Sequence, residues 1–195
     1  MNRKNFLKFS IFFAFFALLL GGVWGQTTYT WTGDGGDTAW ENASNWDVGG
    51  ATPGSGDSVV IPDVSDSTNI YPVLNTDIEI ESLEIEEKAS LSLAGKISLT
   101  LTGSLTGAGT LNMDPGNPST LTVSGDFTVN SFSAGTSTVN LGGTGTVSAH
   151  SFARLNITGG TRTLTGDVTA QTFTSASGTD IAGPYNLTIS GNAVF

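Results

Sequence analysis

Apolar and polar residues alternate through much of this chain. Single polar residues separate the apolar ones at positions 78–80, 83–85 and 91–93. A period of two predicts β-strands that bury one face. Glycine recurs between the alternating stretches, and after Gln26 the apolar residues nowhere follow a helical spacing. The pattern therefore predicts an all-β protein built from many short strands.

One five-residue phrase occurs four times, in the order Leu, polar, aliphatic, Ser or Thr, Gly. The copies are 22, 34 and 32 residues apart, and a longer match joins residues 125–133 to 166–174. Repeats of this length are typical of solenoids, whose units bury their apolar side chains on neighbouring units. The predicted repeat core consists of Leu99, Leu101, Leu121, Val123, Leu155, Ile157, Leu187 and Ile189.

These repeats favour a right-handed parallel β-helix (β-solenoid) over residues 76–195. Thr and Ser would face solvent on the strands, and Gly would turn the corners at positive φ. With roughly 20 to 22 residues a turn, this segment would make about five or six turns. An immunoglobulin-like sandwich is the rival, but it does not require one phrase four times. We recognise no closing segment before residue 195, so we expect an open or truncated solenoid there.

Residues 26–75 differ from the repeats because they are acidic and rich in tryptophan. Three tryptophans within 16 otherwise polar residues need an apolar surface to bury against. We expect an N-terminal cap that closes the solenoid core, since an uncovered end would expose unpaired strand edges. The alternative is an exposed aromatic platform that stacks sugar rings. The predicted cap residues are Trp31, Trp40, Asn42, Asn45 and Trp46.

The same segment resembles a module at the start of bacterial secreted and surface β-helix proteins of the adhesin-like and autotransporter-like kind. The resemblance rests on W-T-G at 31–33, W-x-N-x-x-N-W at 40–46 and P-x-x-x-D-x-V-V-I-P at 53–62. It implies a β-helix architecture. The matched motifs contain no enzymatic residues, so it implies no activity.

The first 25 residues predict a cleaved secretory signal peptide. Three basic residues precede an apolar run at 11–20, and Val23 and Gly25 occupy the −3 and −1 positions of a cleavage site. The apolar stretch 11–24 is shorter than the roughly 20 residues that span a bilayer. We therefore expect a secreted or cell-surface protein, extracytoplasmic, with no membrane span after cleavage.

Charge and composition exclude several classes of protein. The chain has no cysteine, which excludes disulfide scaffolds, zinc ribbons and thiol catalysis. Its net charge is −10, and residues 26–89 hold thirteen of the 17 acidic side chains. We expect no nucleic-acid partner, because this charge repels a phosphate backbone.

The acidic residues supply weak candidates for a metal site. Asp34, Asp37 and Asp57 lie in Gly-rich loops, where carboxylates suit a structural calcium ion. The segment matches neither an EF-hand loop nor a calcium-binding nonapeptide array, so solvated acidic turns are the alternative. Asp126 and Asp167 follow glycine at matching positions, and we expect both in turns where they bond their own backbone.

No catalytic constellation is recognisable. Lys96, Arg154 and Arg162 are scattered, and His150, the single histidine, is expected at a surface or corner. We therefore expect a non-catalytic structural or adhesive module, with glycan, extracellular matrix or further coils of a longer chain as partners. The alternative is the N-terminal fragment of a carbohydrate-active, polysaccharide lyase-like β-helix enzyme whose catalytic coils lie elsewhere.

Overall fold

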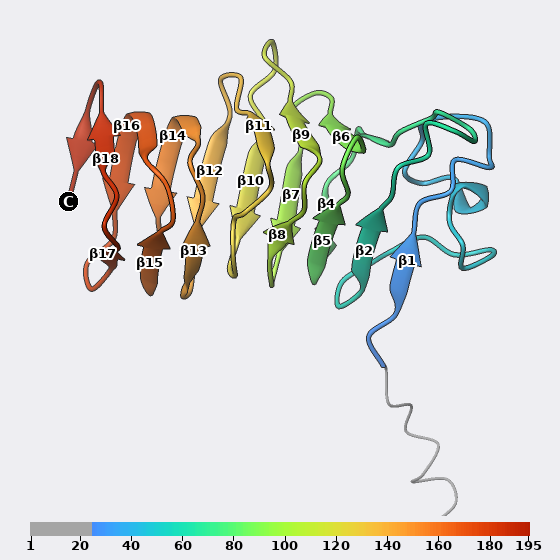
Figure 1. Ribbon diagram of the computed structural model, residues 1–195, viewed down its shortest axis with the longest axis horizontal. Helices are drawn as coiled ribbons and strands as arrows, with labels where there is room; N and C mark the ends of the chain where they lie inside the picture. The colour runs from blue at the N-terminus through green and yellow to red at the C-terminus, as the bar shows by residue number, and fades with distance from the viewer. Residues whose placement is uncertain (1–24) are drawn as a thin grey trace, which may run out of the picture.

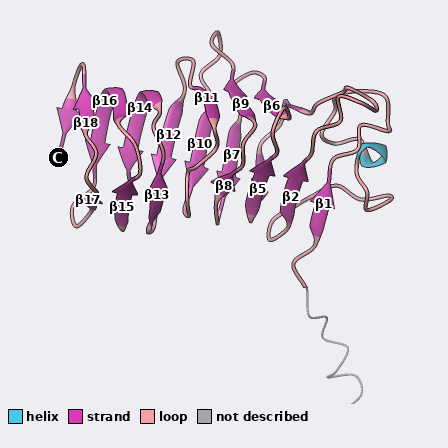
Figure 2. Ribbon diagram, viewed as in Figure 1, coloured by secondary structure: helices cyan, strands magenta, loops and turns pink. Residues whose placement is uncertain are grey.

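The structure is a computed structural model that describes residues 25–195. The predicted signal peptide, apart from Gly25, lies outside the described residues. The described chain winds into a parallel β-solenoid of about six turns (Figures 1 and 2). Its one helical element is a 3₁₀ turn, η1 (Ala43–Asn45). The predicted all-β parallel solenoid is confirmed.

Each turn contributes strands to as many as three faces. The first face contains β1 (Thr28–Thr30), β2 (Ser58–Ile61), β5 (Ser82–Ile85) and β8 (Leu105–Thr106). Through Phe127, which bridges to Leu105 and to Val147, it continues into β13 (Gly145–Val147), β15 (Thr161–Leu164) and β17 (Asp180–Ala182). The second face contains β3 (Val73–Leu74), β6 (Ser90–Leu93), β9 (Thr110–Met113) and β11 (Ser131–Ser133).

The third face belongs to an eight-stranded sheet, the largest in the molecule. Its strands are β4 (Ile78–Ile80), β7 (Ser98–Leu101), β10 (Thr120–Val123), β12 (Thr138–Leu141), β14 (Ser151–Ile157), β16 (Val168–Ser175), β18 (Leu187–Ile189) and β19 (Ala193–Val194). β16 is long enough to pair with β18 near its start and with β19 near its end. The later strands of this sheet therefore bend from the second face onto the third.

In-register pairing stacks like residues in columns. Leu99, Leu121, Val139 and Leu155 are Cα partners in successive strands, and all four are buried. Each fully buried aliphatic side chain of this kind contributes about 1.5–3 kcal/mol to stability. One continuous cluster of buried apolar residues extends from Tyr29 to Phe173. The core therefore runs through the stacked turns and into the tryptophan segment.

The repeated phrases do not all occupy the same face. Leu187 and Ile189 pair with Val168 and Ala170, and they are half-buried instead of stacking above Leu155. Phe173 is the residue that pairs with Leu155. The phrase therefore repeats a strand and its corner, not a whole turn of the solenoid.

The ladder of strands begins inside the segment predicted to be the cap. β1 pairs with β2, and β2 pairs with β5, all in parallel. The first face therefore passes by direct strand pairing from residues 58–61 to residues 82–85. The tryptophan loop and the first turns share one core.

Glycine is required where a corner passes close to the neighbouring turn. Gly160 has φ +68°, and a Cβ at this position would lie 2.1 Å from the carbonyl oxygen of Gly143. Gly178 has φ +79°, but a Cβ there would have no atom within 4 Å. The two glycines thus separate the cost of the backbone conformation from the cost of close stacking.

We expect Gly160→Ala to destabilise the protein more than Gly178→Ala. Both substitutions place alanine in the left-handed region, which costs about 1–2 kcal/mol. Gly160→Ala also forces two turns apart, which adds about 1–3 kcal/mol or more. Urea unfolding of the two variants measures the difference, and equal losses would contradict the close stacking at residue 160.

Candidate functional site

The three tryptophans form a compact cluster at one end of the core. Trp31, Trp40 and Trp46 are all buried. The Trp46 ring meets Trp31 edge-on at 5.1 Å between centroids and Trp40 at 4.7 Å. Trp31 Nε1 donates a hydrogen bond to the carbonyl oxygen of Ile70, and Trp46 Nε1 donates one to that of Trp40, at 2.7 and 2.8 Å. The predicted buried cluster is confirmed, and the exposed platform for sugar rings is wrong because the side chains of these three tryptophans are buried.

The two asparagines of the W-x-N-x-x-N-W string shape the loop that carries the indoles. Asn45 is fully buried, and its Nδ2 donates to Asp37 Oδ1 at 2.8 Å and to the carbonyl oxygen of Ala39 at 3.0 Å. Asn42 Oδ1 accepts from the backbone N–H of Ser44 and so caps η1, while its Nδ2 donates to Asp37 Oδ2. Both asparagines therefore converge on one carboxylate.

The calcium candidates do not converge in the same way. Hydrogen bonds from Asn45, Ala39 and Asn42 occupy the Asp37 carboxylate and lower its pKa. Asp57 accepts from the backbone N–H groups of Gly54 and Thr27. Within residues 25–195, no group of three or more His, Cys, Asp or Glu side chains is placed to hold a metal ion. Asp37 and Asp57 act as acceptors for loop N–H groups, whereas Asp34 is exposed.

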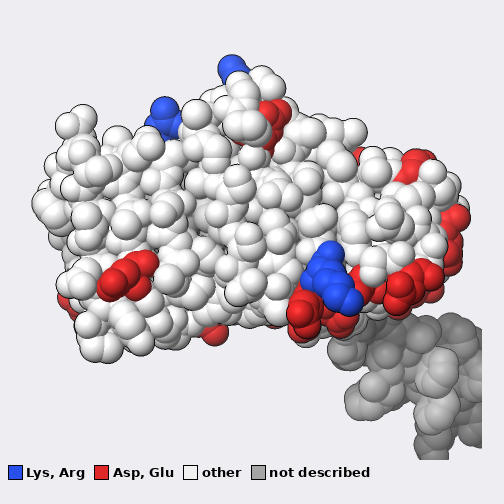
Figure 3. All heavy atoms as spheres, turned by 45° about the horizontal axis from the view of Figure 1, so that its top comes forward, with Lys and Arg blue, Asp and Glu red and all other residues white. Residues whose placement is uncertain are grey.

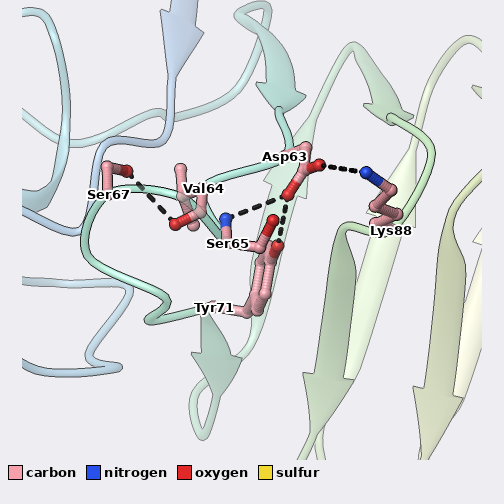
Figure 4. A network of polar contacts seen from close by, with 6 residues as sticks. All are labelled: Asp63, Val64, Ser65, Ser67, Tyr71 and Lys88. Atoms are coloured by element: carbon pink, nitrogen blue, oxygen red, sulfur yellow. Dashed lines mark hydrogen bonds and ion pairs between the residues drawn. The ribbon is translucent and has the colours of Figure 1, made fainter.

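A separate polar network fixes the loop after β2 (Figure 4). Asp63 Oδ1 accepts from the backbone N–H of Ser65 at 2.9 Å and from the Tyr71 hydroxyl at 3.1 Å. Lys88 Nζ lies 3.4 Å from Asp63 Oδ2. Hydrogen bonds from the Ser65 side chain and backbone, then from Tyr71 and Lys88, lower the pKa of Asp63 to about 2. This carboxylate thus joins two turns of the solenoid.

Asp126 and Asp167 lie at corners, and each carboxylate accepts a hydrogen bond from the backbone of the following turn. Asp126 Oδ1 accepts from the backbone N–H of Thr146 at 2.7 Å, and Asp167 Oδ1 accepts from that of Asn186 at 2.9 Å. The expectation that they would bond their own backbone is corrected by these contacts. The reason is that stacking brings the N–H groups of a following corner within reach.

Arg162 is buried inside the solenoid. Its Nη1 donates to the carbonyl oxygen of Gly125, and its Nη2 donates to those of Val123 and Ser124 at 3.1 and 3.2 Å. Burial lowers the pKa of Arg162, while the nearby Asp126 opposes that change. These hydrogen bonds connect the corner at residues 123–125 to the later strand β15. Because it is buried, the guanidinium is not available to a ligand in solvent. The alternation along β15 indicates this buried position, because Arg162 lies two residues before the buried Leu164 and therefore faces the same side of the strand.

His150 lies at the corner between β13 and β14, one of the two positions expected for it, but its side chain is buried and not at the surface. It lies among Phe127, Phe132 and Phe152, with ring centroids 5.2, 5.8 and 6.2 Å from its own. Its Nε2 lies 2.9 Å from the Ser148 hydroxyl oxygen. Desolvation lowers the pKa of His150, which favours the neutral ring at physiological pH.

Charge is distributed unevenly over the surface. In the face shown in Figure 3, acidic side chains gather at the end that carries the first turns, while much of the remaining surface is uncharged. On the third face, outward residues form columns of hydroxyl and amide groups. In one column, Asn156 Nδ2 donates to Asn140 Oδ1 at 2.8 Å, and Asn140 Nδ2 donates to Thr122 Oγ1 at 3.4 Å.

A shallow groove lies beside this face. It has a volume of about 590 Å³ and is bordered by residues from β11, β14, β16 and β18, from the loop after β11 and from Ser190, which follows β18. Its lining consists of Phe132, Ser133, Ala134, Gly135, Ser151, Phe152, Ala153, Thr169, Ala170, Gln171, Thr188 and Ser190. These positions belong to consecutive turns, and the sequence expectations did not include the groove.

Comparisons with protein-family models, curated proteins and solved structures found no match for this chain. Over the part of the chain that the structure describes, no helix is long and apolar enough to cross a membrane.

We expect Trp46→Phe to cost more stability than Trp40→Phe. Both substitutions remove the same atoms from the same cluster, but only Trp46 loses a hydrogen bond, the one to the Trp40 carbonyl. In the described residues, Trp40 Nε1 has no acceptor. The difference should be about 1 kcal/mol in the free energy of unfolding. A larger loss for Trp40→Phe would contradict this assignment.

The contribution of Asp63 to stability should depend on pH. Its pKa in the folded protein is lowered from 3.8 to about 2, so the folded state favours the ionised carboxylate. The stabilisation is therefore fully present above pH 3.8 and is lost as the pH falls through about 2. NMR titration should show Tyr71→Phe raising the pKa of Asp63 towards its ordinary value. An unchanged pKa would contradict a contribution from the hydroxyl.

Proposed function

We propose that this chain is a non-catalytic structural or adhesive module that acts outside the cytoplasm, in secreted form or at the cell surface. The supporting observation is the stacked surface, mostly of hydroxyl and amide groups, that a continuous core holds in register. Such a surface presents many similar weak contacts at a fixed spacing. Repeated contacts suit attachment to a polymeric partner, because linked weak contacts reinforce one another.

The placement of the charged side chains also supports a non-catalytic binding role in preference to an enzymatic one. Asp126 and Asp167 bond backbone N–H groups, and Arg162 bonds buried carbonyl oxygens. These residues thus serve the stacking of turns. A glycosidase would instead need two carboxylates facing each other across a cleft.

Extracytoplasmic action rests on the N-terminal sequence. Its basic start, short apolar run and small residues before Gln26 are those of a secretory signal. The resemblance of residues 29–62 to modules of bacterial surface and secreted β-helix proteins favours the same location. Glycan and extracellular matrix are the partner classes that this placement offers.

Adhesion can be measured with beads that carry the purified chain. We expect these beads to be retained on surfaces coated with polysaccharide or matrix protein, and beads with the urea-unfolded chain to be released. The same preparation should not shorten neutral or acidic polysaccharides, as measured by new reducing ends. Retention equal to that of the unfolded chain would refute the adhesive role, and polymer shortening would favour the enzyme alternative.

A further inference from the structure

The groove beside the third face arises from a change in the path of the chain. After β11, residues 134–137 form a loop before the chain enters β12. One turn later, β14 runs without interruption from Phe152 into Arg154, which pairs with Thr138 of β12. The corner loop is therefore absent from the later turn. The loop after β11 is left as a wall beside the flatter surface of β14, β16 and β18.

The floor of the groove includes a column of short hydroxyl side chains. Ser151, Thr169 and Thr188 are Cα partners in β14, β16 and β18, and all three are exposed. Thr169 Oγ1 donates to Ser151 Oγ at 2.8 Å. Ala153, Gln171 and Ser190 line the groove beside this column. Neighbouring members of a column are about 4.8 Å apart, the spacing of strands in a sheet.

The wall side supplies an apolar surface. Phe132 is half-buried, and its ring contacts Phe127 and Phe152 with centroids at 5.2 and 5.5 Å. None of the lining residues, all within the described chain, carries a charge. Hydroxyl and amide groups beside an aromatic ring match the surface of a sugar, which has polar edges and apolar faces.

We propose that this groove binds an extended, uncharged glycan that lies along the solenoid axis. One sugar unit of an extended β-linked chain advances by about the spacing of one strand, so successive units would meet equivalent side chains on successive turns. The absence of cationic lining residues disfavours an anionic polysaccharide. The inference rests on the adhesive function proposed above and adds to it a site and a ligand class.

An extended peptide fits the same groove less well. Peptides that add a strand to a sheet need a free edge with unpaired backbone groups. Here β14, β16 and β18 pair with one another along the floor. The rings of Phe132 and Phe152 are in contact between β11 and β14, whereas an inserted strand would need about twice the 4.8 Å strand spacing.

The test uses the purified full chain and four uncharged hexasaccharides: cellohexaose, xylohexaose, laminarihexaose and chitohexaose. Calorimetric titration should detect binding of at least one of them. Thr169→Arg fills the groove and should weaken that binding at least about tenfold, which corresponds to about 1.4 kcal/mol. Thr174→Arg is the matched control, because Thr174 lies on the same strand, is exposed and does not line the groove.

Gln171→Ala provides a second variant that leaves the groove open. Loss of one hydrogen bond should weaken binding about threefold to tenfold, consistent with about 0.5–1.5 kcal/mol. Thermal unfolding of all three variants shows whether they remain folded.

Three outcomes would overturn the inference. They are binding of no uncharged hexasaccharide, equal weakening by Thr169→Arg and Thr174→Arg, and binding of hexagalacturonate or a decapeptide of alternating Thr and Val in place of the uncharged sugars. If beads still adhere to matrix protein while every hexasaccharide fails, the groove inference is wrong and the adhesive function stands. If the beads also fail to adhere, both proposals are wrong.

Discussion

The structure depends on one constraint, the in-register stacking of each turn on the turn before it. Parallel hydrogen bonding fixes the spacing at about 4.8 Å, so neither strands nor corners can move apart without breaking the ladder. At Gly107 a Cβ would lie 2.0 Å from the carbonyl oxygen of Ile85. A side chain at such a corner is incompatible with the spacing. Glycine at the closely stacked corners, such as Gly107 and Gly160, follows from the same limit.

Stacking also governs where charges are tolerated, because a column places successive side chains directly beside one another. Like charges in such a position destabilise a sheet. Glu79 is paired with Thr100, and Glu84 is paired with Val60 and Thr106, so neither carboxylate lies opposite another in its ladder. In the later turns, Asp126 and Arg162 bond backbone groups instead. The low charge of the repeats is thus a consequence of their geometry.

Much of the fold could be predicted from the sequence, because alternation and glycine spacing are local signals of strands and corners. The buried tryptophan cluster was predictable for the same reason, since three large apolar rings among polar residues require a core. The face occupied by Leu187 and Ile189 was not predictable. It depends on how many residues each corner uses, and the bend within β14 and β16 removes a corner without changing the local phrase. The interior position of Arg162 was marked by its parity, but its partners at residues 123–125 are set by stacking alone.

The groove shows why a binding surface on a solenoid is difficult to find in the sequence. Its floor comes from single residues spaced about one turn apart, and in isolation Ser151, Thr169 and Thr188 are ordinary strand hydroxyls. They become a surface only because a loop present in the turn of β11 is missing from the turns that follow. A uniform solenoid would present the same surface on every turn, so a repetitive ligand could bind in several equivalent registers. The loop after β11, next to Phe132, ends the repetitive surface at one side. A surface with a defined end can fix the position of a repetitive ligand.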